Sequence, residues 1–306
     1  MSDKVVRLSN GLKVPVICYG PGMMQYNMLG WENIRKLKIE WNNKYFQMLK
    51  KDYKKERTIQ KIILDEEGPI FIDTASAYGV AEKVIGTCMN GIEREKIILC
   101  TKLSAKDQIR NGRNIKKVYE NSMKTMGIKR ADIYFMHWPW EKNYIDVWKQ
   151  MEELYLQGKV RAIGVCNCHI HHLENILSKA EVKPMIHQME VHPLFTQTKE
   201  REFCKKEGIQ VMAYTPLARN DDRLFNNRTL NKIGHKKHKS VAQIILRWHL
   251  QLGNIPVVST SDLEHYRENM DIFDFELSEE EVDSISRLNI NSRLRYDSDN
   301  CDYYEL

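Results

Sequence analysis

Four polar residues follow short apolar runs, and their types suit proton transfer to a reacting oxygen. Asp73 follows Ile-Phe-Ile, Lys102 ends Ile-Ile-Leu-Cys-Thr-Lys, His137 follows a run ending in Phe-Met, and Tyr78 lies five residues after Asp73. A phenol has an ordinary pKa of about 10, and a nearby ammonium lowers that pKa by stabilising the phenolate. A carboxylate would keep the lysine charged, and a histidine would orient the substrate oxygen. Each residue alone is more often a structural hydrogen-bonding group, but four in order favour proton-transfer chemistry.

The elements that must position these residues alternate between strand-like and helix-like patterns. Short apolar runs that end in small or polar residues occupy residues 70–75, 97–102, 132–138, 161–167, 185–191, 209–214 and 255–260. Between them, residues 114–127, 144–158 and 240–253 repeat apolar side chains at a spacing of three to four, which is typical of amphipathic helices. Strands that alternate with helices predict a parallel sheet with right-handed crossovers.

An early run at residues 15–20 brings the predicted strands to eight. Eight parallel strands favour a closed (β/α)8 TIM barrel, although an open doubly wound sheet has the same local pattern. No G-x-G-x-x-G sequence follows any predicted strand, and no P-loop is present. The barrel is therefore the better prediction, and its active site is expected at the C-terminal ends of the strands.

The chain is expected to form one domain over residues 1–306. Residues 5–17 predict a β-hairpin that turns at Asn10-Gly11 and covers the lower end of the barrel. Residues 23–55 form an insertion between the first barrel strand and a helix predicted over residues 56–68. We see no internal repeat and no linker that would divide the chain.

Composition excludes several classes of function. The N-terminus does not resemble a signal peptide, and no apolar run approaches the roughly 20 residues of a membrane span, so a cytoplasmic protein is expected. The formal net charge is +6, and the basic residues between Arg35 and Arg57 are interspersed with acidic ones. A solvated helix face explains that segment better than a nucleic-acid site does.

Cysteines and histidines gather in one short segment. Cys166 and Cys168 are followed by His169, His171 and His172. Zinc sites usually combine such a cluster with a second pair of ligands further along the chain, and no such pair is apparent. We therefore expect no metal, and we interpret the segment as a strand that runs into a helix. The seven cysteines are scattered, which fits reduced thiols better than a disulfide framework.

Taken together, these segments resemble the aldo-keto reductase family. The resemblance extends from about residue 5 to the end of the chain apart from the insertion, and it rests on these segments in order: FIDTASAYG, TKLS, ADIYFMHWP, GKVRAIGVCN, HQMEVHP, AYTPLA and KSVAQIILRWHLQLGNIPVV. It implies a (β/α)8 barrel enzyme that reduces an aldehyde, ketone or sugar carbonyl, or oxidises the alcohol, with NADP or NAD as cofactor.

Matched by position, the resemblance implies a role for each candidate residue. Tyr78 would be the general acid, Lys102 would lower its pKa, Asp73 would hold Lys102, and His137 would orient the carbonyl, with Trp138 beside it in the substrate pocket. The implied cofactor contacts are Gly20, Cys166, Asn167, Gln188, Tyr214, Thr215, Leu217, Ser259, Thr260, His265, Glu268 and Asn269.

The chain departs from the family pattern at both ends of the implied cofactor site. Cys166 replaces the usual serine, and a thiol is a weaker hydrogen-bonding group than a hydroxyl. Ser259, Thr260 and His265 stand where members often carry a Lys-Ser pair and an arginine that bind the 2′-phosphate of NADPH. Charged hydrogen bonds are worth ~1.5–3 kcal/mol each, so we expect use of both NADH and NADPH, with NADPH slightly favoured.

The insertion leads to a hypothesis about the substrate. Leu37, Trp41, Phe46 and Leu49 have near-helical spacing, so the segment is either a helical lid or a helix packed on the barrel wall. As a lid, its basic residues would favour an anionic substrate. A non-catalytic, cofactor-binding regulatory protein on the same fold is the alternative function, and a lyase or isomerase would need phosphate-binding or metal-binding residues that we do not find.

Overall fold

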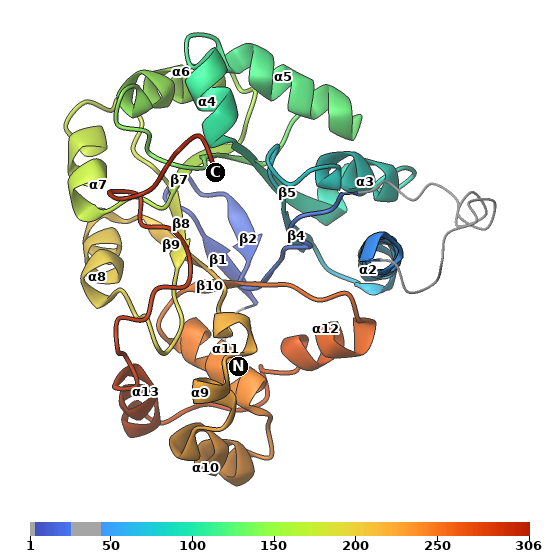
Figure 1. Ribbon diagram of the computed structural model, residues 1–306, viewed down its shortest axis with the longest axis vertical. Coiled ribbons are helices and arrows are strands. Elements are labelled where there is room, and N and C mark those ends of the chain that lie inside the picture. The colour runs from blue at the N-terminus through green and yellow to red at the C-terminus, as the bar shows by residue number, and fades with distance from the viewer. Residues whose placement is uncertain (1–3, 26–43) are drawn as a thin grey trace.

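Short apolar runs form a closed barrel of eight parallel strands, which is the predicted fold (Figure 1). The computed structural model describes residues 4–25 and 44–306. The strands are buried because helices surround the barrel, so their sequences are mostly apolar, although β5 and β8 also bury polar side chains. In sequence order the barrel strands are β3 (Cys18–Tyr19), β4 (Ile70–Asp73), β5 (Ile97–Leu103), β6 (Ile133–Met136), β7 (Ala162–Cys166), β8 (Ile186–Glu190), β9 (Gln210–Tyr214) and β10 (Ile255–Val258).

Pairing between the first and last barrel strands excludes the open sheet that the sequence left possible. Strand β10 pairs in parallel with β3 through Val257 with Cys18 and Val258 with Tyr19, and it also pairs with β9. The helices around the barrel are α2 (Lys44–Asp65), α3 (Ala81–Cys88), α4 (Ala105–Asn111), α5 (Ile115–Met126), α6 (Tyr144–Leu156), α7 (Ile170–Leu177), α8 (Thr198–Glu207), α9 (Asp222–Phe225), α10 (Arg228–Lys237), α11 (Val241–Gln251), α12 (Leu263–Met270) and α13 (Glu279–Ser286).

The predicted hairpin is present, as β1 (Val5–Arg7) and β2 (Lys13–Pro15) in antiparallel register. Gly11 has a φ of +87°, a conformation that the turn requires and that glycine adopts without steric cost. Asn10 Nδ2 donates a hydrogen bond to the backbone oxygen of Arg161, directly before β7, at 2.8 Å. The turn therefore contacts the N-terminal end of a barrel strand, as expected of a segment that covers the lower end.

The insertion after β3 continues into a helix that is longer than predicted. Helix α2 begins at Lys44, within the insertion, and ends at Asp65, so it crosses the boundary that we placed at residue 55. Of the four residues that suggested a lid, Leu37 and Trp41 lie outside the described residues, and Phe46 and Leu49 belong to α2. The lid hypothesis therefore stays a hypothesis.

The last segment of the chain, residues 291–306 and called the tail below, crosses toward the C-terminal ends of the strands. In Figure 1 it is red and runs from α13 past α8 and α7 to a C-terminus near β7 and α4. Tyr303 packs edge-on against Trp138, with ring centroids 6.4 Å apart, and both belong to a small apolar cluster with Ala105. Among the described helices, none has the length and apolar character needed to cross a bilayer.

Candidate active site

Strand register brings the carboxylate and the ammonium of the predicted site together. Asp73 ends β4 and is paired with Cys100 of β5, and Lys102 lies two residues further along β5. Successive side chains alternate between the faces of a strand, so Cys100 and Lys102 point to the same side. Both contact Asp73, because Cys100 Sγ donates to Asp73 Oδ1 at 3.1 Å and Lys102 Nζ donates to the same carboxylate.

Lys102 is held by a buried ion pair. Its Nζ lies 2.6 Å from each carboxylate oxygen of Asp73 and 2.9 Å from the backbone oxygen of Thr74, and the lysine is fully buried. Burial lowers the pKa of Lys102, but the charge of Asp73 and the neighbouring Tyr78 and Cys166 raise it, and the net result is a raised pKa. Lys102 therefore stays an ammonium at neutral pH.

Tyr78 lies against this ammonium, with Lys102 Nζ 4.9 Å from the centre of the phenol ring. Burial raises the pKa of Tyr78 and exceeds the effect of Lys102, which lowers it through its charge and a hydrogen bond. Lys102 therefore acts on the phenol pKa in the expected direction, but the net pKa of Tyr78 in the protein alone is raised because the exclusion of water has the larger effect. A raised pKa keeps the proton on the phenol, where a general acid needs it.

His137 follows β6 and faces the same phenol. The rings of His137 and Tyr78 meet edge to face with centroids 5.7 Å apart, and the Nδ1 atom of His137 is buried without a hydrogen-bond partner among the described residues. Burial lowers the pKa of His137 well below 6.5, and the charges of Lys102 and Arg295 lower it further. The imidazole is therefore neutral and can orient an oxygen by hydrogen bonding.

The loop that carries Tyr78 is fixed by the start of the insertion. The backbone N–H of Met24 donates to the oxygen of Tyr78 at 3.1 Å, and the N–H of Val80 donates to the oxygen of Met24 at 2.8 Å. Gly79 lies between these bonds with a φ of +64°, and a Cβ there would lie 2.1 Å from the Met24 oxygen. Sequence analysis did not anticipate this contact.

The residues expected at the nicotinamide end lie beside the tetrad of Asp73, Tyr78, Lys102 and His137. Asn167 donates from Nδ2 to the backbone oxygen of His137 at 3.0 Å, and its Oδ1 accepts a 2.7 Å hydrogen bond from the Tyr214 hydroxyl. Gln188 donates from Nε2 to Asp73 Oδ1 at 3.0 Å. Cys166 ends β7 and is fully buried, and burial raises the pKa of its thiol.

The remaining residues expected to contact the cofactor follow other barrel strands or lie on α12. They are Gly20 after β3, Thr215 and Leu217 after β9, Ser259 and Thr260 after β10, and His265, Glu268 and Asn269 on α12. Ser259, His265 and Glu268 are exposed, whereas Asn269 is buried. A hydrogen bond of 2.7 Å from the Tyr19 hydroxyl to the Thr260 oxygen joins the first and last strands at this edge.

Glu190 and Arg295 also shape the site, and we predicted neither of them. Glu190, the buried last residue of β8, accepts hydrogen bonds from the backbone N–H groups of Leu294 at 2.7 Å and Arg295 at 2.9 Å. These bonds hold the tail so that the charge of Arg295 affects the pKa of both His137 and Tyr214. No sequence signal links positions about a hundred residues apart, so only the fold reveals them.

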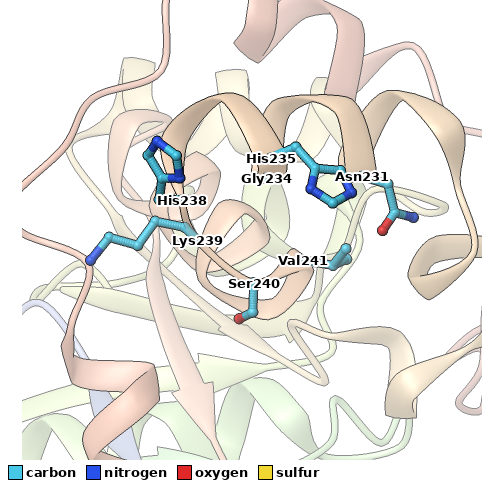
Figure 2. A pocket seen from close by; sticks show the side chains of 7 residues that line it. All are labelled: Asn231, Gly234, His235, His238, Lys239, Ser240 and Val241. Carbon is cyan, nitrogen blue, oxygen red and sulfur yellow. The ribbon is translucent and has the colours of Figure 1, made fainter.

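A separate hollow of about 240 Å³ lies between the end of α10 and the start of α11 (Figure 2). Its lining residues are Asn231, Gly234, His235, His238, Lys239, Ser240 and Val241, and none belongs to the tetrad. Lys239 is paired with Asp271 at 2.8 Å, and Ser240 caps α11. These groups serve the fold, and we assign no chemistry to this hollow.

The strands close into a (β/α)8 barrel, and a buried ammonium lies between a carboxylate and a phenol at the C-terminal ends of its strands. Residues 40–290 match the model of the Aldo/keto reductase family. The chain therefore belongs to the aldo-keto reductase family and is an oxidoreductase, as the sequence motifs indicated.

Known proteins agree with this assignment over most of the chain. Glyoxal reductase of Bacillus subtilis is 37% identical over 290 residues, which cover 94% of each protein. Methylglyoxal reductase DkgA of Escherichia coli is 34% identical over 244 residues, covering 79% of this chain and 86% of that protein. The crystal structure of a Bombyx mori aldo-keto reductase in complex with NADP superposes with a TM-score of 0.79 at 26% identity, covering 98% of this chain and 97% of that one.

Proposed function

We propose that this protein uses a nicotinamide cofactor to reduce the carbonyl of a small aldehyde or ketone, with Tyr78 as the general acid. The observation that supports the proposal most directly is the position of Lys102, which pairs with Asp73 at 2.6 Å and lies 4.9 Å from the Tyr78 ring centre. The same groups would catalyse alcohol oxidation in the reverse direction.

The residues at the strand ends fit a bound nicotinamide cofactor. Thr215 Oγ1 is buried and has no hydrogen-bond partner within residues 4–25 and 44–306, and it lies next to Tyr214 at the C-terminal end of β9. Gly20 lies against Asp73, and a Cβ there would approach Val257 Cγ1 to 2.8 Å, so only glycine leaves this edge open. When bound, the cofactor supplies hydride to the carbonyl carbon. Asn167, Gln188 and Tyr214 would hold its nicotinamide end.

The tetrad divides the remaining work of a reduction. His137, neutral because burial lowers its pKa, would donate a hydrogen bond to the carbonyl oxygen and orient it beside Tyr78. Tyr78 would transfer its proton to that oxygen as negative charge develops there. Lys102 would stabilise the resulting phenolate, and Asp73 would keep the ammonium in place.

We infer that the substrate is small and carries a second oxygen function. The relatives named for glyoxal and methylglyoxal reduction support a 2-oxoaldehyde. The positive charge of Arg295 acts on His137, which supports a carboxylate or another anionic group next to the carbonyl. Glyoxal, methylglyoxal and a 2-oxo acid are therefore the first compounds to test.

The experiment is a cofactor-oxidation assay with these compounds, comparing the wild-type protein with Tyr78→Phe. Loss of a general acid costs about 10²–10⁴-fold in rate, so kcat should fall by about a thousandfold while cofactor affinity stays within about twofold. The matched control is Tyr304→Phe, because Tyr304 is exposed in the tail. Cofactor binding without turnover in the wild-type protein would contradict the proposal and favour the regulatory alternative.

Cofactor choice is a separate proposal. Ser259 and His265 are exposed and bring no permanent positive charge. Arg267, on the same helix as His265, makes a 3.4 Å contact with Asp65 in which both side chains are at least half exposed. We expect NADH and NADPH to be used with kcat/KM values within about tenfold of each other. His265→Arg should raise the NADPH preference by about tenfold or more, since a charged hydrogen bond is worth ~1.5–3 kcal/mol. A hundredfold NADPH preference in the wild-type protein would refute this.

A further inference from the structure

We propose that Glu141, His171, His172 and Asp299 bind a divalent transition-metal ion of the zinc type, and that the ion fastens the tail to the start of α7. This inference does not depend on the proposed catalytic function, because none of the four residues belongs to the tetrad. The four are called the tail cluster below.

Three separate parts of the chain supply the donors. Glu141 lies in the loop between β6 and α6, His171 and His172 lie in the first turn of α7, and Asp299 lies in the tail. One donor atom from each residue lies within 4.8 Å of the other three. Residues this far apart in the chain meet only because the tail returns across the barrel.

The separations between donors suit metal ligands better than hydrogen bonds. Asp299 Oδ1 lies 3.4 Å from His171 Nε2 and 3.6 Å from His172 Nε2. Glu141 Oε1 lies 3.8 Å from His172 Nε2. Hydrogen bonds need about 2.7–3.2 Å, so these distances are too long. Ligands about 2.0–2.1 Å from a tetrahedral zinc ion are separated from one another by about 3.4 Å.

His172 provides an independent indication of a ligand. Its side chain is fully buried, and its Nε2 atom has no hydrogen-bond partner in the described part of the chain although it faces two carboxylates. The Nδ1 atom accepts the backbone N–H of His169 at 3.2 Å, which fixes the ring. Metal binding at Nε2 would place the ring proton on Nδ1, so this contact must open. His169 is the N-cap of α7, so zinc binding would replace one of the two hydrogen bonds of its capping box.

Neighbouring contacts hold the donors in place before any metal binds. His169 Nε2 and Asp297 Oδ1 form a 2.7 Å hydrogen bond that joins the tail to α7. Asp297 Oδ1 also accepts the backbone N–H of Asp299 at 3.1 Å, which turns Asp299 back toward the helix. Glu141 and His171 have mostly exposed side chains and can make the small movements that convergence requires.

The donor set predicts which ion binds. Two imidazoles with two carboxylates suit zinc and its transition-metal neighbours, whereas magnesium and calcium prefer oxygen ligands alone. Two carboxylates also balance the charge of a divalent ion. Sequence analysis expected no metal because the histidine segment had no second pair of ligands, and Glu141 and Asp299 would be that pair.

A metal at this position would fix one wall of the proposed substrate pocket. The Tyr303 hydroxyl, four residues beyond Asp299, donates to the backbone oxygens of Ser298 at 2.7 Å and Pro139 at 3.2 Å, and its ring packs on Trp138. Anchoring Asp299 to α7 therefore also anchors the aromatic contact beside the tetrad.

The test is isothermal titration of the full-length, tag-free protein with ZnCl2 after treatment with a chelator. We expect saturable binding of one ion per chain, no binding of Mg²⁺ under the same conditions, and a higher Tm with Zn²⁺ present. Asp299→Asn, Glu141→Gln and His172→Gln should each weaken zinc binding at least about tenfold.

Two matched variants make the result decisive. Asp302→Asn removes an exposed tail carboxylate outside the cluster, and Cys301→Ser removes the partly exposed thiol that could bind zinc by itself. Both should bind zinc as the wild type does. The proposal is overturned if one-to-one binding is absent, if Asp299→Asn and Glu141→Gln bind normally while still folded by circular dichroism, or if Cys301→Ser abolishes binding.

Discussion

The barrel mouth and the tail cluster hold their polar groups in different ways. At the mouth, Lys102 and Asp73 are buried and 2.6 Å apart, and Gln188 adds a 3.0 Å hydrogen bond to the same carboxylate. In the tail cluster, the side chain of Asp299 is half exposed, and its distances to the histidine nitrogens are 3.4 Å or more.

This difference separates two ways of building a site. At the mouth, the strands fix the groups, each charge is compensated within the barrel, and the protein alone completes the network. In the tail cluster, the donors come from two loops and a helix start, and their separations exceed hydrogen-bond length. Removing a charge at the barrel mouth should therefore greatly reduce the stability of the protein. Removing a charge in the tail cluster should leave the stability almost unchanged.

The substitution Lys102→Met should have the largest effect on stability and turnover. This change leaves Asp73 charged, buried and without its ion-pair partner, which should lower the free energy of unfolding by about 3–5 kcal/mol and abolish turnover. Asp299→Asn is the matched comparison and, measured without metal, should change the free energy of unfolding by less than about 0.5 kcal/mol. Urea denaturation of both variants measures the contrast, and equal losses would remove the distinction between the two regions.

A smaller effect is expected at the loop that carries Tyr78. Gly79→Ala would place a Cβ 2.1 Å from the Met24 oxygen, in addition to forcing a left-handed conformation on alanine. We expect a loss of about 2–3 kcal/mol in unfolding free energy and at least about tenfold in kcat, because Tyr78 would move.

The control for that prediction is Gly91→Ala. Gly91 has a similar φ of +78°, but a Cβ there would meet nothing within 4 Å. The Gly91→Ala variant should therefore lose only about 1 kcal/mol of unfolding free energy and keep its kcat. If both variants lose the same activity, the contact between the insertion and the Tyr78 loop does not position the phenol.

The same contrast explains how far sequence reasoning could reach. Asp73, Lys102 and His137 were predictable because each lies at the end of a strand whose apolar pattern is local, and because parallel strands bring such ends together; Tyr78 lies in the loop that follows β4. The barrel and the helix predicted over residues 144–158, observed as Tyr144–Leu156, followed from periodicity, whereas the hairpin followed from the Asn10-Gly11 turn. Alternation of strands and helices could not exclude an open sheet, since only the pairing of β10 with β3 closes the barrel.

Contacts made by irregular segments could not be predicted from local sequence patterns. The bonds of Glu190 to the tail, the pairing of Met24 with the Tyr78 loop, and the approach of Asp299 to His172 all join residues without a shared periodicity. The larger, opposing effect of burial on the Tyr78 pKa was not anticipated, because the extent of burial depends on the whole barrel and not on the neighbouring lysine.

The smallest expected effect concerns pH and tests whether the two regions are independent. Reduction requires a protonated Tyr78, a charged Lys102 and a neutral His137. The pKa of Tyr78 is raised above 10, that of Lys102 is raised above 10.5, and that of His137 is lowered below 6.5. All three groups therefore keep their required states between pH 6.5 and pH 10, and kcat for reduction should vary by less than about twofold across that range.

In the described structure His169 does not contact the reacting groups, so His169→Asn should leave this profile unchanged. A break in kcat inside the range that persists in His169→Asn would mean that a tetrad pKa lies closer to neutrality than burial implies. A break that disappears in His169→Asn would instead show that the contact between α7 and the tail influences the barrel mouth, through Asp297 and the Tyr303–Trp138 contact. The profile of this variant thus identifies which region controls the reaction near neutral pH.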